Sequence, residues 1–164
     1  MKKLVIYYSL TGNIKFIAEA IAEATGADIL ELKTEKELIK KEGLIKYFLG
    51  GKKTVMGEKP KIMPLNKNPE DYDVLFIGTP VWACNYTPHV RSFFSQVKLI
   101  NKKISFFCSS GGLKGKIFEN MKKELIGNEF IGEVAFIEPL KNNPEECTRK
   151  ARQWASDLIK NHGF

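Results

Sequence analysis

The sequence predicts an α/β fold, a three-layer doubly wound sandwich in which helices cover both faces of a parallel sheet. Three observations predict it: short apolar runs of strand length, amphipathic runs of helical period, and the alternation of the two along 164 residues. Continuously apolar strands are typical of parallel sheets, which are buried on both faces. The length and 43% hydrophobic content suit one core, so we expect a single domain over residues 1–164.

The first two strands and the helix between them are clearly marked. Residues 4–8 form an apolar run that predicts a buried strand and ends in a turn-forming segment. An apolar stripe over residues 14–22 predicts a helix, and Gly26 stands where a left-handed residue commonly ends one. Residues 28–32 predict the second strand.

The stretch from Glu35 to Pro69 is harder to interpret. Its first part predicts a helix to about Leu49, and Gly50-Gly51 then leads into a segment rich in Lys and Pro. We expect a long excursion over residues 43–67, with a role that the sequence does not define.

The rest of the chain returns to regular alternation. Strands are predicted over residues 74–78, 103–108 and 132–137, and helices after the N-caps Thr87 and Asn143 and over residues 116–125. Five strands joined by right-handed crossovers favour a five-stranded parallel sheet, and 2-1-3-4-5 is one common strand order. The strand count alone leaves the order open.

The loop after the first strand has the composition of a phosphate cradle. Ser9-Leu10-Thr11-Gly12-Asn13 combines two hydroxyls, an amide and a glycine just before a helix, whose first N–H groups and dipole favour an anion. A plain turn with Asn13 as N-cap is the alternative. Its place at the end of the first strand, where doubly wound sheets bind ligands, favours the phosphate site.

The run from Tyr8 to Asn13 resembles the phosphate loop of the flavodoxin family, which reads hydroxyl, any residue, Thr, Gly, Asn, hydroxyl. Ile14 stands in place of the final hydroxyl and would offer only its backbone N–H. The resemblance covers nearly the whole chain and implies a flavodoxin-like fold with FMN as a non-covalent cofactor. It implies that the phosphate is bound by Ser9, Leu10, Thr11, Gly12, Asn13 and Ile14.

The loop after the third strand resembles the flavin-ring loop that carries a Gly-Thr-Pro-x-Trp pattern. The resemblance implies ring contacts from Thr79, Pro80, Val81, Trp82, Ala83 and Asn85. We expect the face of Trp82 to pack on the isoalloxazine, with core packing as the alternative and Tyr86 as a weaker ring contact. Ser109, Ser110, Gly111 and Gly112 correspond in placement to the third flavin loop, although a simple turn would also explain the two glycines.

These features predict electron transfer between redox partner proteins, with the chemistry supplied by the flavin and no catalytic residue from the chain. The alternative is an FMN-dependent NAD(P)H oxidoreductase that reduces a quinone or a similar small acceptor. The sequence argues against a phosphoacceptor signalling domain, because the third strand ends in Gly78-Thr79 where an aspartate would be expected.

The net charge of +7 suggests an acidic protein partner. The lysines are scattered and lack interleaved aromatic residues, so we expect no nucleic-acid partner, and the apolar runs are too short to predict a membrane span. We expect a cytoplasmic protein whose Cys84, Cys108 and Cys147 are reduced, with Cys84 an inert buried thiol. His89 and His162 lack the spaced ligands of a metal site.

Overall fold

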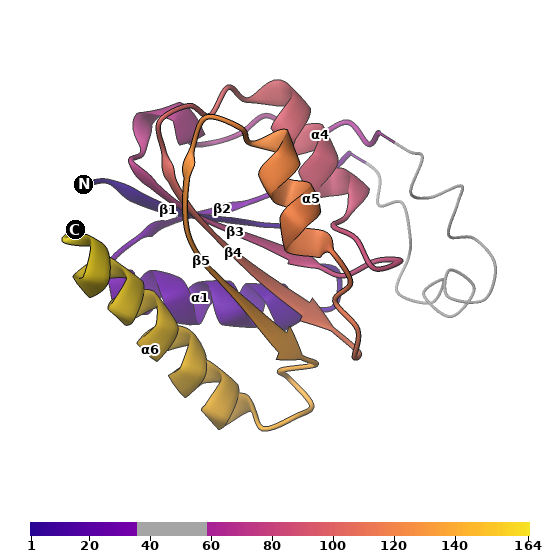
Figure 1. The fold of residues 1–164 in the computed structure, drawn as a ribbon. Helices are drawn as coiled ribbons and strands as arrows, with labels where there is room; N and C mark the ends of the chain where they lie inside the picture. The colour runs from indigo at the N-terminus through magenta and orange to yellow at the C-terminus, as the bar shows by residue number, and fades with distance from the viewer. Residues whose placement is uncertain (36–58) are drawn as a thin grey trace.

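The computed structural model describes residues 1–35 and 59–164 and contains a five-stranded parallel sheet (Figure 1). The strands are β1 (Lys3–Tyr7), β2 (Asp28–Glu31), β3 (Val74–Pro80), β4 (Lys103–Ser110) and β5 (Glu129–Ile137). Their order across the sheet is β2-β1-β3-β4-β5. The predicted doubly wound fold and strand order are confirmed.

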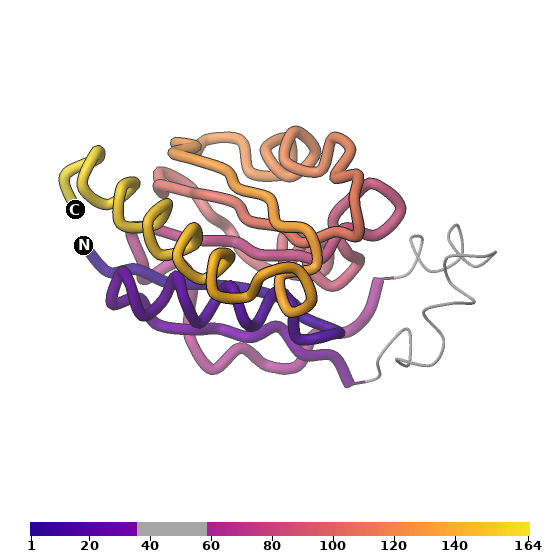
Figure 2. Tube along the Cα trace, turned by 90° about the horizontal axis from the view of Figure 1, so that it is seen from below, coloured from indigo at the N-terminus to yellow at the C-terminus, as the bar shows by residue number. Residues whose placement is uncertain are grey.

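Helices form the two outer layers of the sandwich. They are α1 (Asn13–Thr25), α4 (Pro88–Gln96), α5 (Ile117–Glu124) and α6 (Pro144–His162), and a 3₁₀ turn, η3 (Pro69–Asp71), precedes β3. Helices α1 and α6 lie side by side on one face, and α4 and α5 cover the other (Figures 1 and 2). Arg152 of α6 and Glu23 of α1 form an ion pair of 2.6 Å between the two neighbours.

The alternation of side chains along each strand creates a core on each face of the sheet. In β1, Leu4 and Ile6 face α4 and α5, whereas Val5 and Tyr7 face α1 and α6. All four side chains are buried, as expected for a central strand of a parallel sheet.

Three strand boundaries differ from the predicted ones by more than one residue. Strands β3 and β4 are longer than expected because their pairing continues to Pro80 and Ser109, and β5 begins at Glu129 rather than at residue 132. Thr87 stands at the N-cap position of α4, but among the described residues its side chain makes no cap hydrogen bond. The predicted cap at Asn143 is confirmed, because its side chain accepts a hydrogen bond from the N–H of Glu146.

The helix predicted to Leu49 lies outside the described residues, as does most of the excursion of residues 43–67. The described residues on either side lie next to each other beyond β2. Thr34 forms an antiparallel bridge with Ile62, and the N–H of Met63 donates to the carbonyl of Lys33 at 2.8 Å. An ion pair of 2.7 Å between Lys61 and Glu35 adds to this link. Residues 33–35 and 61–63 therefore pair with each other just beyond the carboxyl end of β2.

Within the described ranges, none of the helices has the length and apolar character needed to span a membrane.

Gly78 in β3 leaves the space that the ring of Phe107 in β4 occupies. A Cβ at position 78 would lie 2.2 Å from Phe107 Cζ, and Phe107 is fully buried. We expect Gly78→Ala to lower the free energy of unfolding by about 1–3 kcal/mol through overpacking, measured by urea denaturation. The control is Gly112→Ala, whose Cβ would meet nothing within 4 Å. Equal denaturation midpoints for the two variants would contradict this packing.

Candidate functional site

The predicted site loops meet at the carboxyl edge of the sheet, where the winding reverses. The chain leaves β1 towards α1 on one face, and it leaves β3 towards α4 on the other. Backbone hydrogen bonds join the strand ends: Tyr8 N–H donates to Gly78 O at 3.3 Å, and Val81 N–H donates to Ser109 O at 2.9 Å. The structure therefore brings the three loops to one edge.

The start of α1 has the polarity of an anion site. Gly12 is its N-cap, in a left-handed conformation with φ 90°, and the first helical hydrogen bond runs from Phe16 N–H to Gly12 O. The N–H groups of Asn13 and Ile14 therefore have no acceptor within the helix. The first turn of α1 contains no acidic residue, so no carboxylate there neutralises the positive end of the dipole.

The two hydroxyls of the loop are oriented by protein donors. Ser9 Oγ accepts a hydrogen bond from Lys15 N–H at 3.2 Å, and Thr11 Oγ1 accepts one from Asn13 Nδ2 at 3.1 Å. A hydroxyl that accepts from the protein still carries its own hydrogen, which it can donate to a bound anion. These residues fit a phosphate group.

The two remaining residues of this loop point into the protein. Ile14, the second residue of α1, buries its side chain in the core between the helix and the sheet, so only its backbone is available to a ligand. Leu10 packs against the core on the α4 face.

The loop after β3 contains a strained, closed turn. Trp82 and Asn85 exchange backbone hydrogen bonds of 2.9 and 3.0 Å, which places Ala83 and Cys84 at the tip with φ values of 49° and 60°. Each left-handed non-glycine residue costs about 1–2 kcal/mol. Gly115 packs on the turn so closely that a Cβ there would lie 2.6 Å from Cys84 O.

Trp82 lies inside the core and not on the surface of the site. Its indole is 3% exposed and packs edge-on against Tyr8 and His89, with ring centroids 6.0 and 5.7 Å apart. This is the core packing given above as the alternative. A stacked flavin would require the indole to turn outward, and that contact stays a prediction.

The side chains of two other predicted ring contacts, Thr79 and Asn85, form hydrogen bonds within the protein. The fully buried Thr79 hydroxyl accepts from Thr87 N–H at 3.2 Å and donates to Pro80 O at 3.0 Å. Asn85 Oδ1 accepts from Tyr86 N–H and from Asn120 Nδ2 of α5, at 2.9 and 3.3 Å.

Tyr86 is also buried, and its hydroxyl donates to Glu124 of α5 at 3.0 Å. Pro80 and Val81 are half-buried, and Ala83 is exposed at the tip of the turn. The polar side chains of Thr79 and Asn85 and the phenol of Tyr86 are therefore engaged within the protein.

The third loop is small and open. The Ser110 hydroxyl donates to Gly112 O at 3.1 Å and accepts from Gly112 N–H at 3.3 Å, while Gly111 and Gly112 are exposed. Ser109 is buried and receives the Val81 N–H on its carbonyl. The loop after β4 thus presents backbone to the same edge as the loop after β3.

The prediction that Cys84 is a buried thiol is wrong: the residue is exposed. The physical reason is its position at the tip of the turn, which projects beyond the strand ends. Cys108 is buried in β4, and burial raises the pKa of its thiol to about 12, so it stays protonated at neutral pH. Cys84, Cys108 and Cys147 are all free thiols.

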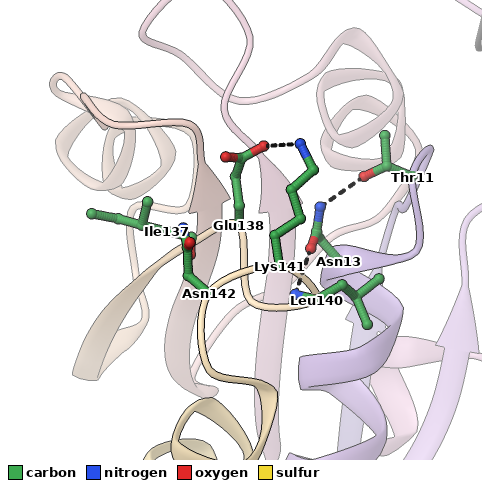
Figure 3. Close-up of polar contacts among 7 residues, drawn as sticks. All are labelled: Thr11, Asn13, Ile137, Glu138, Leu140, Lys141 and Asn142. Atoms are coloured by element: carbon green, nitrogen blue, oxygen red, sulfur yellow. Dashed lines mark hydrogen bonds and ion pairs between the residues drawn. The ribbon is translucent and has the colours of Figure 1, made fainter.

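The turn after β5, at residues 138–142, also borders the site, and the sequence did not predict it there. Leu140 N–H donates to Asn13 Oδ1 at 3.0 Å (Figure 3). Glu138 N–H donates to Ser110 O at 3.1 Å, so this turn lies against two of the predicted loops. Lys141-Asn142-Asn143-Pro144 marks a turn in the sequence, but its contact with a loop 127 residues away leaves no local signal.

This chain is similar to a known protein family and to several solved structures. The family model described as Flavodoxin matches residues 2–133. A Lactobacillus acidophilus flavoprotein solved in complex with FMN aligns with a TM-score of 0.68 and 21% identity, over 88% of this chain and 98% of that one.

Two further structures align over nearly their full lengths. A putative flavoprotein from Bacteroides eggerthii has a TM-score of 0.74 and 22% identity, over 96% of this chain and 98% of that one. Oxidised Flavodoxin 2 from Bacillus cereus has a TM-score of 0.60 and 20% identity, over 98% and 99%. At these identities the likeness is one of fold.

The packing of His89 beneath the loops makes stability depend on pH. Its ring is buried and stacks on Tyr8 with centroids 3.6 Å apart, and burial lowers its pKa from 6.5 to about 4. As the pH falls, the His89 side chain of the unfolded chain takes up a proton before that of the folded chain does. The contribution of the neutral His89 to the free energy of unfolding is therefore complete above pH 6.5 and is lost as the pH falls towards 4. We expect a loss of about 3 kcal/mol across that window.

Urea denaturation at several pH values measures this loss. His89→Phe should reduce the slope of unfolding free energy against pH between 6.5 and 4, and His162→Gln, a change near the C-terminus, should leave the slope unchanged. An unaltered slope in His89→Phe would rule out burial of a neutral imidazole.

Proposed function

The chain belongs to the flavodoxin family, and we propose that it carries electrons between redox partner proteins on one non-covalently bound FMN. FMN binding comes with membership of the family. One observation supports placing FMN at the carboxyl edge of the sheet. At the start of α1, the hydroxyls of Ser9 and Thr11 each accept a hydrogen bond from the protein and keep a hydrogen that they can donate to the phosphate.

The residues that would hold FMN divide into two groups. The N–H groups of Asn13 and Ile14 and the hydroxyls of Ser9 and Thr11 would bind the phosphate. The loops after β3 and β4 would border the ring through their main chain. The bound flavin supplies one- and two-electron redox chemistry, and the chain binds and orients it.

The composition of the predicted site supports a carrier. The predicted phosphate and ring residues include no Asp, Glu, Lys, Arg or His, so they offer no acid–base pair for a chemical step on a substrate. Electron transfer needs none.

A hollow at the end of β2 supports the second candidate, an FMN-dependent NAD(P)H oxidoreductase acting on a quinone or similar acceptor. It has a volume of about 410 Å³ and is lined by residues that include Tyr7, Lys15, Lys33 and Met63. Lys15 lies in the first turn of α1, so the hollow adjoins the predicted phosphate site. It offers room for a second small molecule beside the cofactor.

The phosphate contacts can be tested by comparing FMN with riboflavin. We expect Ser9→Ala to weaken FMN binding about tenfold, since a hydrogen bond to a charged group is lost, and to leave riboflavin binding unchanged. Absorbance titration measures both ligands, and Ser156→Ala on α6 is the matched control. A variant that loses both ligands equally would place the phosphate elsewhere.

Anaerobic addition of NADPH to the FMN-loaded protein separates the two candidate functions. For a carrier, we expect no reduction by NADPH alone and rapid reduction once a flavoprotein reductase is added. The absorbance of the oxidised flavin measures both steps. Multiple turnovers with NADPH and a quinone in the absence of a reductase would favour the enzyme instead.

The net charge of +7 leads us to propose an acidic redox partner. We expect the rate of electron transfer from that partner to fall as ionic strength rises, since the Debye length shortens from about 30 Å at 0.01 M to about 10 Å at 0.1 M. Stopped-flow reduction over a salt series measures this. Rates that do not change with salt would argue against electrostatic association.

A further inference from the structure

The turn at residues 138–142 touches the phosphate loop at two points and the third loop at one. Its Leu140 N–H donates to Asn13 Oδ1 at 3.0 Å, and Leu140 Cδ1 lies 3.4 Å from where a Cβ on Gly12 would be. Glu138 N–H donates to Ser110 O at 3.1 Å. This turn therefore links the two ends of the predicted FMN site.

The turn has internal bonds that hold its shape. The N–H groups of Lys141 and Asn142 donate to the carbonyl of Glu138 at 2.8 and 2.9 Å, and Asn142 Nδ2 donates to Ile137 O at 3.3 Å. Lys141 Nζ and Glu138 Oε1 form an ion pair of 2.7 Å. Such a turn is a fixed support for a neighbouring loop.

The amide of Asn13 can take only one orientation between its two partners. Leu140 presents an N–H, which requires the oxygen Oδ1, so Nδ2 is directed to Thr11 Oγ1 at 3.1 Å (Figure 3). Because Thr11 Oγ1 accepts this bond, its own hydrogen points away from Asn13. The amide thus sets the direction in which the Thr11 hydroxyl donates.

We propose that the turn at residues 138–142 is part of the phosphate site and acts through Asn13, which links it to the phosphate loop. Asn13 anchors the loop to the turn through Oδ1 and orients the Thr11 hydroxyl through Nδ2. Fixing these groups before the ligand arrives lowers the ordering cost of binding. The inference rests on the proposed function, because it assigns a role within the FMN site.

The local geometry separates this role from simple helix capping. The N-cap of α1 is Gly12, and Asn13 is the first helical residue. Its side chain reaches across to a turn 127 residues away. A helix cap would bond to the N–H groups of its own first turn.

Binding of FMN and riboflavin to Asn13→Ala tests the proposal. We expect the Kd for FMN to rise about tenfold and the Kd for riboflavin, which lacks the phosphate, to stay unchanged. Asn161→Ala is the matched control, because it removes an exposed amide near the C-terminal end of α6, outside the loops and the turn at residues 138–142. Thermal melting checks that each variant is folded.

A double-mutant cycle with Thr11→Val tests whether Asn13 acts through the hydroxyl. We expect Asn13→Ala to weaken FMN binding less in the Thr11→Val background than in the wild type. The proposal would be overturned if the increases in the Kd for FMN caused by the two substitutions simply multiplied in the double variant. An equal loss of riboflavin binding would also overturn it.

Amide hydrogen exchange of wild-type Leu140 gives a measurement that needs no variant. FMN should slow this exchange more than riboflavin does, because the phosphate stabilises the loop to which the amide is bonded. Equal effects of the two ligands would overturn the proposal. If the wild type bound neither ligand, the proposed function itself would fail. If it bound FMN and Asn13→Ala bound it equally well, only the role of Asn13 would fail.

Discussion

The site depends on the parallel pairing of β1 with β3 at the point where the winding reverses. Tyr7 is in register with Gly78, and the next N–H, that of Tyr8, donates to Gly78 O. Beyond this pair, the chain turns to α1 on one face and to α4 on the other, so neither crossover covers the strand ends. Gly78 makes the pairing compatible with the core, since Phe107 occupies the space a side chain would need. The surface left at this edge consists of turns and helix ends, which offer main-chain groups together with the hydroxyls of Ser9 and Thr11.

A site built from main chain explains why so many of the predicted contact residues have internal roles. Each of three such side chains accepts a hydrogen bond from another part of the protein. Thr79 accepts from the N-cap residue of α4, Asn85 from α5, and Asn13 from the turn at residues 138–142. What remains for a ligand is the N–H and C=O groups of these loops and the hydroxyls of Ser9 and Thr11. Such groups are fixed before binding, so little reorganisation is needed when the ligand arrives.

The sequence predicted the fold well because the relevant signals are local. A continuous apolar run such as residues 4–8 is required of any strand buried on both faces, and the rule for doubly wound sheets then located the loops. It is less informative where a long-range fit decides. The inward position of Trp82 depends on its fit against the stacked rings of Tyr8 and His89. The exposure of Cys84, which was predicted to be buried, follows from two left-handed residues held against Gly115. The contact between Asn13 and Leu140 joins opposite ends of the chain.

The distribution of charge suggests that cofactor binding and association with a partner protein depend on different residues. The predicted phosphate and ring residues carry no formally charged side chain, whereas the chain as a whole has a net charge of +7. Short-range dipoles at the start of α1 would hold a dianion at close range, and their effect falls off within the first turn. The net charge acts over a Debye length and would guide an acidic partner from a distance. A change at Ser9, Thr11 or Asn13 should therefore alter cofactor affinity without altering partner encounter, and a change to surface lysines should do the reverse.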